Sequence, residues 1–510
     1  MTRRGAMALL TAVLSCLPAL AGQLYDGYIL YNNNNNRITY LKDTTWQTVN
    51  SWTGTVNCAY SAYLMPDSSI WRGDVYSGAS MRGAAYGGLM QRYSWDGDIV
   101  ESFVWSNSNH QQHHDFQPMS NGHVLVVSWD RKTNAEAKAL GRLNLTGDIW
   151  PDEVVEYDPA TSSVAWEWHF WDHLIQDVDS TKPNYGVVSE HPGLLDINLG
   201  QVQQGDWMHC NTVDYNELRD EVIVTSHNLH ELYVIDHSTT TAEAASHTGG
   251  RHGKGGDFLY RWGNPQNYDR GTAADRVFYV AHGGNWVKSG MAGAGDIITL
   301  NNGDRSGSTG DSSSVVQITP PLDSADNYYI HPDSAFGPKT PTWIYTNGRS
   351  FYAQHLGGAY RLPNGNTLAV LGTSGTFQEI SPTGQLLRSW TSGGQLGHPM
   401  KYPRDFASGT TEKTGNLPVC RFESVAPNPF ARSCAVHYHL ASRARVRLTL
   451  YDAAGRLVKV IQDMTQDAGT YSAGLTVGSD MPAGIYLIRL QTTVPGGVAR
   501  TVTKPLVKGR

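Results

Sequence analysis

Three histidines occupy the same place in a repeated segment of this chain. His114, His209 and His282 each open a short approach segment that leads through a turn into an apolar strand. If the repeats form a ring, equivalent positions lie at equal radius and height, and the imidazoles should meet at one opening of a central channel. Converging imidazoles suit metal binding, or group transfer with histidine as nucleophile or general acid.

Metal chemistry has the weaker support of the two. Asp115 is the one carboxylate at the histidine register, and the four cysteines after residue 21 form no C-x-x-C pair. We therefore expect neither a metal nor a cofactor. Cys210, next to His209, is predicted to be a small buried hydrophobe. Cys420 and Cys434 could pair in an oxidising compartment.

The elements that would hold these histidines are short strands. Hairpins of alternating apolar residues, often ending in tryptophan, occur at residues 37–52, 89–105, 154–168, from 231, from 314, and at 376–390. A second unit alternates with them, in which a turn such as Pro-Asn-Gly precedes an apolar strand. Its copies lie at residues 60–71, 114–128, 209–226, 282–300 and 357–371.

Each repeat supplies about four strands, so the six repeats predict an all-β fold, a six-bladed β-propeller over residues 22–407. No sixth approach segment is recognisable near residues 397–406, and the strand at 27–31 is expected to close the ring from the other end. An array of β-sandwiches is the alternative, but the absence of linkers between the repeats disfavours it.

Both ends of the chain differ from the repeats. Arg3, Arg4, the apolar residues 6–20 and the small residues 19–21 predict a signal peptide over 1–21, cleaved before Gly22. A buried helix, or a lipid anchor at Cys16, is the alternative. Residues 408–421 form a polar linker. Residues 422–510 predict a small Ig-like β-sandwich with strands at 435–440, 446–452 and 485–492.

Composition narrows the partners. The 510 residues carry a net charge of −7, from 39 basic and 46 acidic side chains, with no basic patch. That balance argues against nucleic acid. Because the first apolar run is too short to span a bilayer and no other long one follows, we expect no transmembrane segment.

Four long motifs resemble the bacterial arylsulfate sulfotransferases. They are HHDFQPMSNGHVLVVSWD, GDWMHCNTVDYNELRDEVIVTSHNLHELYVIDHSTTT, FLYRWGNPQNYDRGTAADRVFYVAHGGNW and YRLPNGNTLAVLGTSGTFQEISPTG. The resemblance implies transfer of a sulfuryl group from a phenolic sulfate to a phenol through a sulfohistidine, without a nucleotide sulfate. By the same resemblance His282 is the nucleophile, His209 a second site histidine, and His114 a third, with His113 as its alternative. His209 or His114 suits proton donation to the leaving phenol oxygen.

The chain departs from the family in one charged position. His227 stands where the family has an arginine, which is always charged and offers a planar fork to an oxyanion. Histidine is charged only near or below a pKa of about 6.5. Arg361 is a candidate for the missing charge, or else a solvated turn residue. Trp207 and Trp286 are candidates for stacking on aryl groups, or else fill the blades.

A second departure is Gly283-Gly284-Asn285, where relatives often carry Asp-Ala-His.

The C-terminal region resembles the sorting domain of type IX secretion. The resemblance rests on APNPF, YDAAGRLV, PAGIYLIRL and the basic end KPLVKGR. It implies export by the type IX machinery across the outer membrane of a Gram-negative bacterium, so the protein is expected to be secreted or at the cell surface.

Two functions compete. One is an exported arylsulfate sulfotransferase with a phenolic sulfate donor and a phenolic acceptor. The other is a non-catalytic propeller that binds a ligand or protein at the cell surface, which the loss of the arginine and the secretion tail favour.

Overall fold

The computed structural model describes residues 22–303, 311–406, 420–440, 443–452, 456–478, 481–493 and 500–509. The chain divides into two compact units, Met1–Phe406 and Ala407–Arg510. The predicted signal peptide, and the predicted linker apart from its last two residues, lie outside the described residues. In the described part of the chain, no helix has the length and apolar character that a membrane crossing requires.

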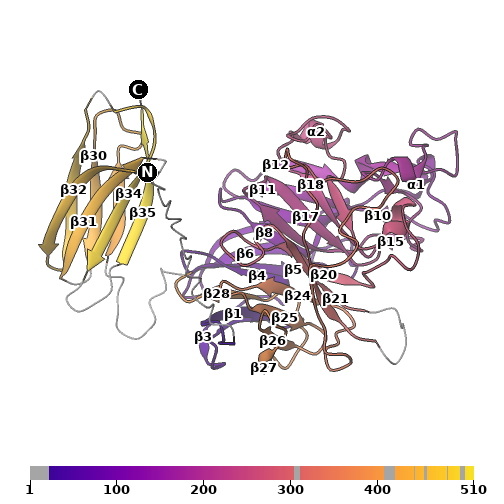
Figure 1. Ribbon diagram of the computed structural model, residues 1–510, viewed down its shortest axis with the longest axis horizontal. Coiled ribbons are helices and arrows are strands. Elements are labelled where there is room, and N and C mark those ends of the chain that lie inside the picture. The colour runs from indigo at the N-terminus through magenta and orange to yellow at the C-terminus, as the bar shows by residue number, and fades with distance from the viewer. Residues whose placement is uncertain are drawn as a thin grey trace, which may run out of the picture. The chain divides into compact units, whose positions relative to one another are not determined.

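The described residues of the first unit contain six four-stranded antiparallel sheets, which follow one another along the chain (Figure 1). Sheet 1 consists of β28 (Met400–Pro403), β1 (Gly27–Asn32), β2 (Ile38–Lys42) and β3 (Thr48–Thr53). Sheet 2 consists of β4 (Cys58–Leu64), β5 (Ile70–Val75), β6 (Gly88–Tyr93) and β7 (Ile99–Val104). Sheet 3 consists of β8 (His110–Pro118), β9 (Val124–Asp130), β11 (Asp152–Asp158) and β12 (Ser163–His169). Sheet 4 consists of β16 (Cys210–Asn216), β17 (Glu221–Ser226), β18 (Glu231–Asp236) and β19 (Tyr260–Trp262). Sheet 5 consists of β20 (Ala281–Trp286), β21 (Ile297–Asn301), β22 (Ser314–Ile318) and β23 (Trp343–Tyr345). Sheet 6 consists of β24 (Gly357–Arg361), β25 (Thr367–Leu371), β26 (Thr376–Ile380) and β27 (Leu386–Thr391).

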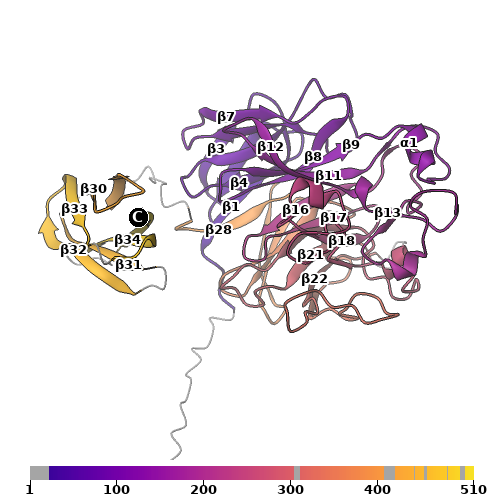
Figure 2. The same cartoon turned by 90° about the horizontal axis from the view of Figure 1, so that it is seen from above.

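The first strands of successive sheets contact one another in the order β1, β4, β8, β16, β20, β24. The two ends of the unit meet in sheet 1, where β28 pairs with β1 and Gly27 lies opposite Pro403 (Figure 2). Lys401 of β28 also binds Glu379 of β26 at 2.6 Å, with both side chains fully buried. The N-terminal strand therefore pairs with the last strand of the unit, and the two ends of the unit share sheet 1.

Hydrophobic cores lie between neighbouring sheets, because alternate side chains of a strand point to opposite faces. In β17, Val222 and Val224 pack with sheet 3, whereas Ile223 packs with sheet 5. Every residue of β17 is buried. This two-sided burial explains why the second strands read as continuous apolar runs.

A tryptophan in or just after the outermost strand joins most sheets to the next one. Five indole N–H groups donate across the boundary: Trp52 to the Ser94 carbonyl (2.8 Å), Trp105 to Ser128 Oγ (3.1 Å), Trp168 to the Gly256 carbonyl (2.7 Å), Trp262 to the Pro338 carbonyl (2.8 Å) and Trp390 to the Thr44 carbonyl (3.2 Å). In sheet 5, Trp343 instead packs under Arg361 of sheet 6, with 5.0 Å between guanidinium and ring centre. The repeated tryptophan is thus a contact between sheets.

Two of the six expected hairpins are wrong in their second strand. After β18 the chain forms α2 (Thr241–Ala244), because Thr240 and Glu243 make a capping box. The fourth strand of that sheet, β19, comes only at residue 260. After β22 a long segment likewise intervenes before β23.

The other short elements lie mostly in the connection between sheets 3 and 4. They are α1 (Asn134–Ala139), the 3-10 helices η1 (Phe170–Asp172), η2 (Val188–Glu190) and η3 (Pro265–Tyr268), and the parallel pairs of β10 (Ile149–Trp150) with β15 (Gly205–Asp206) and of β13 (Leu174–Ile175) with β14 (Leu195–Asp196).

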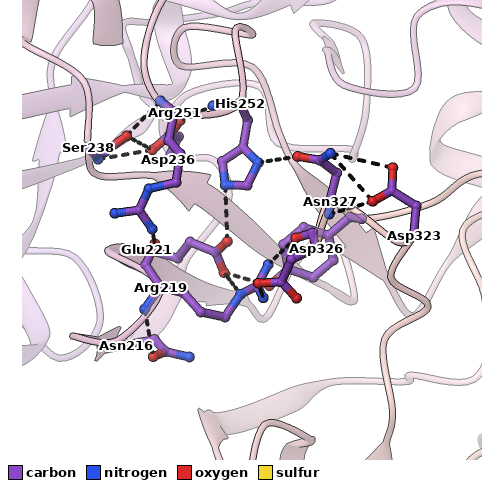
Figure 3. Close-up of polar contacts among 11 residues, drawn as sticks. Asn216, Arg219, Glu221, Asp236, Ser238, Arg251, His252, Asp323, Asp326 and Asn327 are labelled. Carbon is purple, nitrogen blue, oxygen red and sulfur yellow. Dashed lines mark hydrogen bonds and ion pairs between the residues drawn. The ribbon is translucent and has the colours of Figure 1, made fainter.

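A polar network holds two segments against sheet 4, the segment that follows β18 and the segment that follows β22 (Figure 3). Glu221 of β17 accepts from Arg219 Nε at 2.9 Å and from Tyr328 at 2.6 Å. His252 places Nε2 3.4 Å from Glu221 and Nδ1 2.9 Å from Asn327 Oδ1. The network joins the segment after β18 to the segment after β22 through one buried carboxylate.

The second unit contains two antiparallel sheets in its described residues. One comprises β29 (Cys420–Ala426), β30 (Ser433–Leu440) and β33 (Gly469–Thr476), and the other comprises β32 (Leu457–Gln466), β31 (Ala444–Asp452), β34 (Gly484–Thr493) and β35 (Arg500–Lys508). Residues of both sheets form one hydrophobic cluster. The three predicted strands correspond to β30, β31 and β34.

The suggested disulfide between Cys420 and Cys434 is wrong. Cys434 is a free, buried thiol. Cys420 lies opposite Leu440, whereas Ala426 at the other end of β29 lies opposite Ala435. The two cysteines therefore lie at opposite ends of the strand pair, too far apart to be bridged.

Candidate functional site in the channel

Four histidine rings lie next to one another, in edge-on or tilted contacts, where the first strands of sheets 3, 4 and 5 meet. The ring centres are 4.5 Å apart for His114 and His209, 4.8 Å for His209 and His227, and 5.5 Å for His227 and His282. We call these four residues the histidine row. The structure thus brings together all three histidines of the repeat register and the one that replaces the family arginine.

Backbone irregularities aim these side chains. His114 and His209 have φ of +51° and +55°, a left-handed conformation that non-glycine residues rarely adopt. The pairing of the first strand shifts register near each of His114, His209 and His282. Such bulges re-aim side chains and are common beside active sites.

His209 is the member of the row whose pKa is raised. Its Nδ1 lies 2.6 Å from Oδ2 of Asp206, whose Oδ1 accepts from the Trp129 indole at 2.9 Å. Burial alone would lower the pKa of His209, but Asp206 and then Asp152 outweigh it and raise that pKa. Asp206 was missed from sequence, although its place three residues before His209 offered a signal.

His227 is neutral at pH 7. Burial, followed by the charge on His209, lowers the pKa of His227 to about 4. Its Nδ1 lies 2.8 Å from Oδ1 of Asn228. A histidine here therefore does not replace the constant charge of an arginine, and His209 is the cation nearest to that position in the row.

His282 presents an unprotonated nitrogen. Nδ1 lies 2.7 Å from Oδ1 of Asn302, and the Leu356 N–H points at Nε2 at 3.2 Å. Because an amide N–H can only donate, Nε2 carries a lone pair and Nδ1 carries the proton. Burial first, and then the proximity of a second titratable imidazole, His227, hold the pKa of His282 well below its usual range. Asn302 follows β21, and no sequence signal pointed to it.

His113 lies behind His114. Its ring stacks on Trp129, with 4.3 Å between centres, and its Nδ1 is 2.8 Å from Nδ1 of His114. Its Nε2 is 2.8 Å from Oδ1 of Asp152. His113 is fully buried and supports the His114 ring from behind. Burial and the surrounding histidines hold the pKa of His114 well below its usual range.

The row borders a narrow cavity of about 10 Å³, which is room for about one water molecule. Each of the six sheets, or the segment leading into it, contributes to the lining, with Ser61, His114, Asn211, His282, Gly357 and His398 among the lining residues. Asn211, absent from the predicted site, donates to the Ala281 carbonyl at 2.7 Å. A separate open cleft of about 610 Å³ reaches His227, together with Asn228 and His230.

Three residues predicted to bind substrate lie elsewhere. The Arg361 guanidinium donates to the Gly365 carbonyl at 2.9 Å and to Thr367 at 2.7 Å, at the end of β24 remote from Leu356. Trp207 is fully buried and donates to the Leu199 carbonyl at 2.9 Å.

Trp286 packs in the core between sheets 4 and 5. The two tryptophans therefore follow the alternative given from the sequence, that they fill the sheets, and Arg361 bonds within its own turn and to Gln317 of sheet 5.

Two groups among the described residues could hold a metal ion, one formed by His173, His247 and Asp257 and one by His110, Asp130 and Glu153. Neither includes a member of the histidine row. Asp115, the carboxylate at the histidine register, instead accepts from Ser61 at 2.6 Å and from Tyr63 at 2.8 Å.

A family model described as arylsulfotransferase (ASST) matches residues 72–401. No curated protein matches the chain significantly. Among solved structures, a protein of unknown function from Bacteroides caccae is 10% identical, with a TM-score of 0.41 over 74% of this chain and 98% of that chain. A protein from Lactobacillus plantarum is 12% identical, with a TM-score of 0.36 over 88% and 99%. The Dos1 propeller is 9% identical, with a TM-score of 0.30 over 93% and 86%.

Proposed function

This chain belongs to the arylsulfotransferase (ASST) family, and we propose that it is an exported arylsulfate sulfotransferase. It transfers a sulfuryl group from a phenolic sulfate ester to a phenolic acceptor through a sulfohistidine on His282. The observation that carries the proposal is the unprotonated Nε2 of His282, fixed by Asn302 and Leu356, in one row with His209, whose carboxylate partner is Asp206.

In the first half of the reaction, Nε2 of His282 attacks sulfur as the bond from sulfur to the aryl oxygen breaks. The ring keeps its Nδ1 proton and becomes positively charged, which the Asn302 carbonyl oxygen stabilises. In the second half, the acceptor oxygen attacks sulfur and the bond to Nε2 breaks. His282 then returns to its neutral form, and no nucleotide sulfate takes part.

Charge on the sulfuryl oxygens is the main electrostatic demand, as in phosphoryl transfer. His209 supports the proposal because its contact with Asp206 raises its pKa and so favours a positive charge in the row. The Leu356 N–H must leave Nε2 when sulfur bonds there, and it then becomes a donor for a sulfuryl oxygen. The open cleft beside His227 is the proposed place for the aryl groups.

The test is release of a chromogenic phenol from its sulfate ester, with and without an added phenol. We expect turnover that depends on the acceptor. Without an acceptor, we expect the protein to gain the mass of one SO₃ group, mapped to the peptide that contains His282. Absence of both signals would favour the alternative, a non-catalytic binding module, which the small cavity and the loss of the arginine support.

We further propose that the six sheets are the blades of a six-bladed propeller. Their sequential contacts and the closure through β28 support this. We also propose that residues 422–510, with their Ig-like sandwich, are a type IX sorting domain behind a signal peptide at 1–21. Deletion of 422–510 should leave a folded first unit inside the cell envelope, whereas surface delivery of the shortened chain would refute this role.

A further inference from the structure

We propose that His398 is a further catalytic residue, whose Nε2 carries the proton between the phenolic oxygens of acceptor and donor. The proposal rests on the proposed function. His398 lies in the segment leading into β28, and it lines the channel cavity together with His114 and His282. It escaped the sequence analysis because the sixth approach segment is unrecognisable around residue 397.

A buried carboxylate fixes the orientation of the ring. Nδ1 of His398 lies 3.2 Å from Oδ1 of Asp115 and 3.2 Å from the Tyr63 hydroxyl. Asp115 is fully buried and accepts from Ser61, from Tyr63 and, at 3.1 Å, from the Val213 N–H. Both oxygens of Asp115 act as hydrogen-bond acceptors here, so a ring nitrogen that faces them is placed to donate. Nδ1 of His398 therefore carries the proton, and Nε2 carries the lone pair.

Nε2 has no hydrogen-bond partner among the described residues, although it is buried. The residue as a whole is 9% exposed. A buried polar atom without a partner is costly and is rare in folded proteins. Nε2 of His282, by contrast, accepts the Leu356 N–H. The missing hydrogen-bond partner of His398 Nε2 is explained if this atom binds a hydroxyl group that enters the cavity with the substrate.

The arrangement can carry a proton. In the second half of the reaction, Nε2 takes the hydroxyl proton of the acceptor while its oxygen forms the bond to sulfur and the bond from sulfur to His282 breaks. The resulting imidazolium is stabilised by Asp115. In the next first half, the same proton passes to the aryl oxygen that leaves the donor. The cycle therefore consumes and releases no net proton.

The other histidines at the cavity are less suited to this step. His114 shares its Nδ1 contact with another imidazole, not with a carboxylate, and it lies against the charged His209. His209 is tied to Asp206 at 2.6 Å and supplies charge. His282 is the nucleophile. Among the described residues, His398 is thus the cavity histidine that combines a carboxylate partner at one nitrogen with an unpartnered second nitrogen.

The deciding variant is His398→Asn in the full chain. An asparagine amide can keep a donor near Asp115 in place of Nδ1, but it deletes Nε2. Tyr360→Phe is the matched control, because the Tyr360 ring lies 5.3 Å from the His398 ring and takes no part in the proposed relay. Sulfohistidine formation and transfer to phenol are followed separately by rapid quench. The donors are 4-nitrophenyl sulfate and phenyl sulfate.

We expect His398→Asn to form sulfohistidine from 4-nitrophenyl sulfate within a few-fold of the wild-type rate, because nitrophenolate leaves without a proton. Formation from phenyl sulfate, and transfer to phenol, should fall about a hundredfold to a thousandfold. Equal losses with both donors, or losses matched by Tyr360→Phe, would overturn the role of His398. A wild type that forms no sulfohistidine and shows no turnover would instead overturn the proposed function itself.

The orientation has a test that needs no activity. Nitrogen-15 NMR of histidine-labelled full chain, at a pH where the His398 ring is neutral, should show its single proton on Nδ1 and none on Nε2, with the signal assigned by its loss in His398→Asn. A neutral His398 ring with its proton on Nε2 instead would refute the proposal, whatever the kinetics show.

Discussion

The cavity beside the histidine row and the outer edge of sheet 4, by which we mean the surroundings of His237 and His252, shift the pKa of buried histidines in opposite directions. In the channel, burial and the charge of His209 leave His227 with a pKa near 4. At the outer edge, His237 lies 2.7 Å from Asp220 and 2.9 Å from Glu156, and its pKa is raised to about 9 although burial opposes this. His252 in the network of Figure 3 likewise has a raised pKa, because it bonds to Glu221.

The difference teaches that burial alone does not decide the charge of an imidazole. Residue type and depth are similar in the two places, but the neighbours differ: imidazoles in the channel and carboxylates at the edge. Neutral histidines suit attack on sulfur, whereas the charged His237 joins sheet 4 to Glu156 of sheet 3. His209 is the exception in the channel, because Asp206 gives it the partner that the outer histidines have.

The largest expected effect is at His282. Replacement by asparagine removes the nucleophilic nitrogen, and aryl sulfate turnover should fall about ten-thousandfold or more. The measurement is the phenol-dependent release rate at saturating donor. His247→Asn is the control, since that side chain is 60% exposed. Residual activity within tenfold of wild type would show that His282 is not the nucleophile.

The second effect concerns the stability of the first unit. Because the folded pKa of His237 lies above the unfolded value of about 6.5, its stabilisation is complete below pH 6.5 and is lost as pH rises through 9. Raising the pKa of His237 by this amount corresponds to about 3 kcal/mol in the free energy of unfolding. All 15 tryptophans precede residue 407, so tryptophan fluorescence during urea unfolding reports this unit.

Wild type should therefore lose about 3 kcal/mol more stability than His237→Gln between pH 6 and pH 9.5. The comparison between the two proteins removes the contributions of the other histidines. Parallel pH dependence of the two free energies of unfolding would mean that His237 is not held as an imidazolium at the edge.

A third prediction tests the exception in the channel. Asp206→Asn deletes the charge that holds the proton on His209, so the pKa of His209 should fall. Turnover at pH 7 should drop about a hundredfold, and the loss should shrink as pH is lowered. Rate profiles between pH 5.5 and 9 provide the measurement. An unchanged profile would show that the charge on His209 is not needed.

The smallest expected effect is a gain. His227→Arg places a permanent charge where the native histidine is neutral, and transfer at pH 7 to 9 should rise about tenfold. The gain is limited because the guanidinium lies beside His209, whose charge it opposes. His230→Arg, in the same cleft, is the control for added charge alone. A wild type as active as His227→Arg at pH 9 would contradict the role given to position 227.

Much of the fold was predictable because it depends on local patterns. The five recognisable approach segments became pairs of strands, and residues 27–31 became the strand that closes sheet 1. The two hairpin errors have a local cause as well, since the capping box at Thr240 favours a helix where strand alternation fades. Predicted His114, His209 and His282 meet because repeat register fixes radius and height.

By itself, the sequence determined the all-β fold, the repeat and the family, since these follow from spacing and residue type along the chain. Only the tertiary structure decided which histidines are charged, why Arg361 and the two tryptophans lie outside the site, and that His398 lies in it. Those properties depend on residues such as Asp206, Asn302 and Asp115, which reach their partners across separate strands. Burial and the sign of a facing charge arise from contacts in space, and no spacing along the chain encodes them.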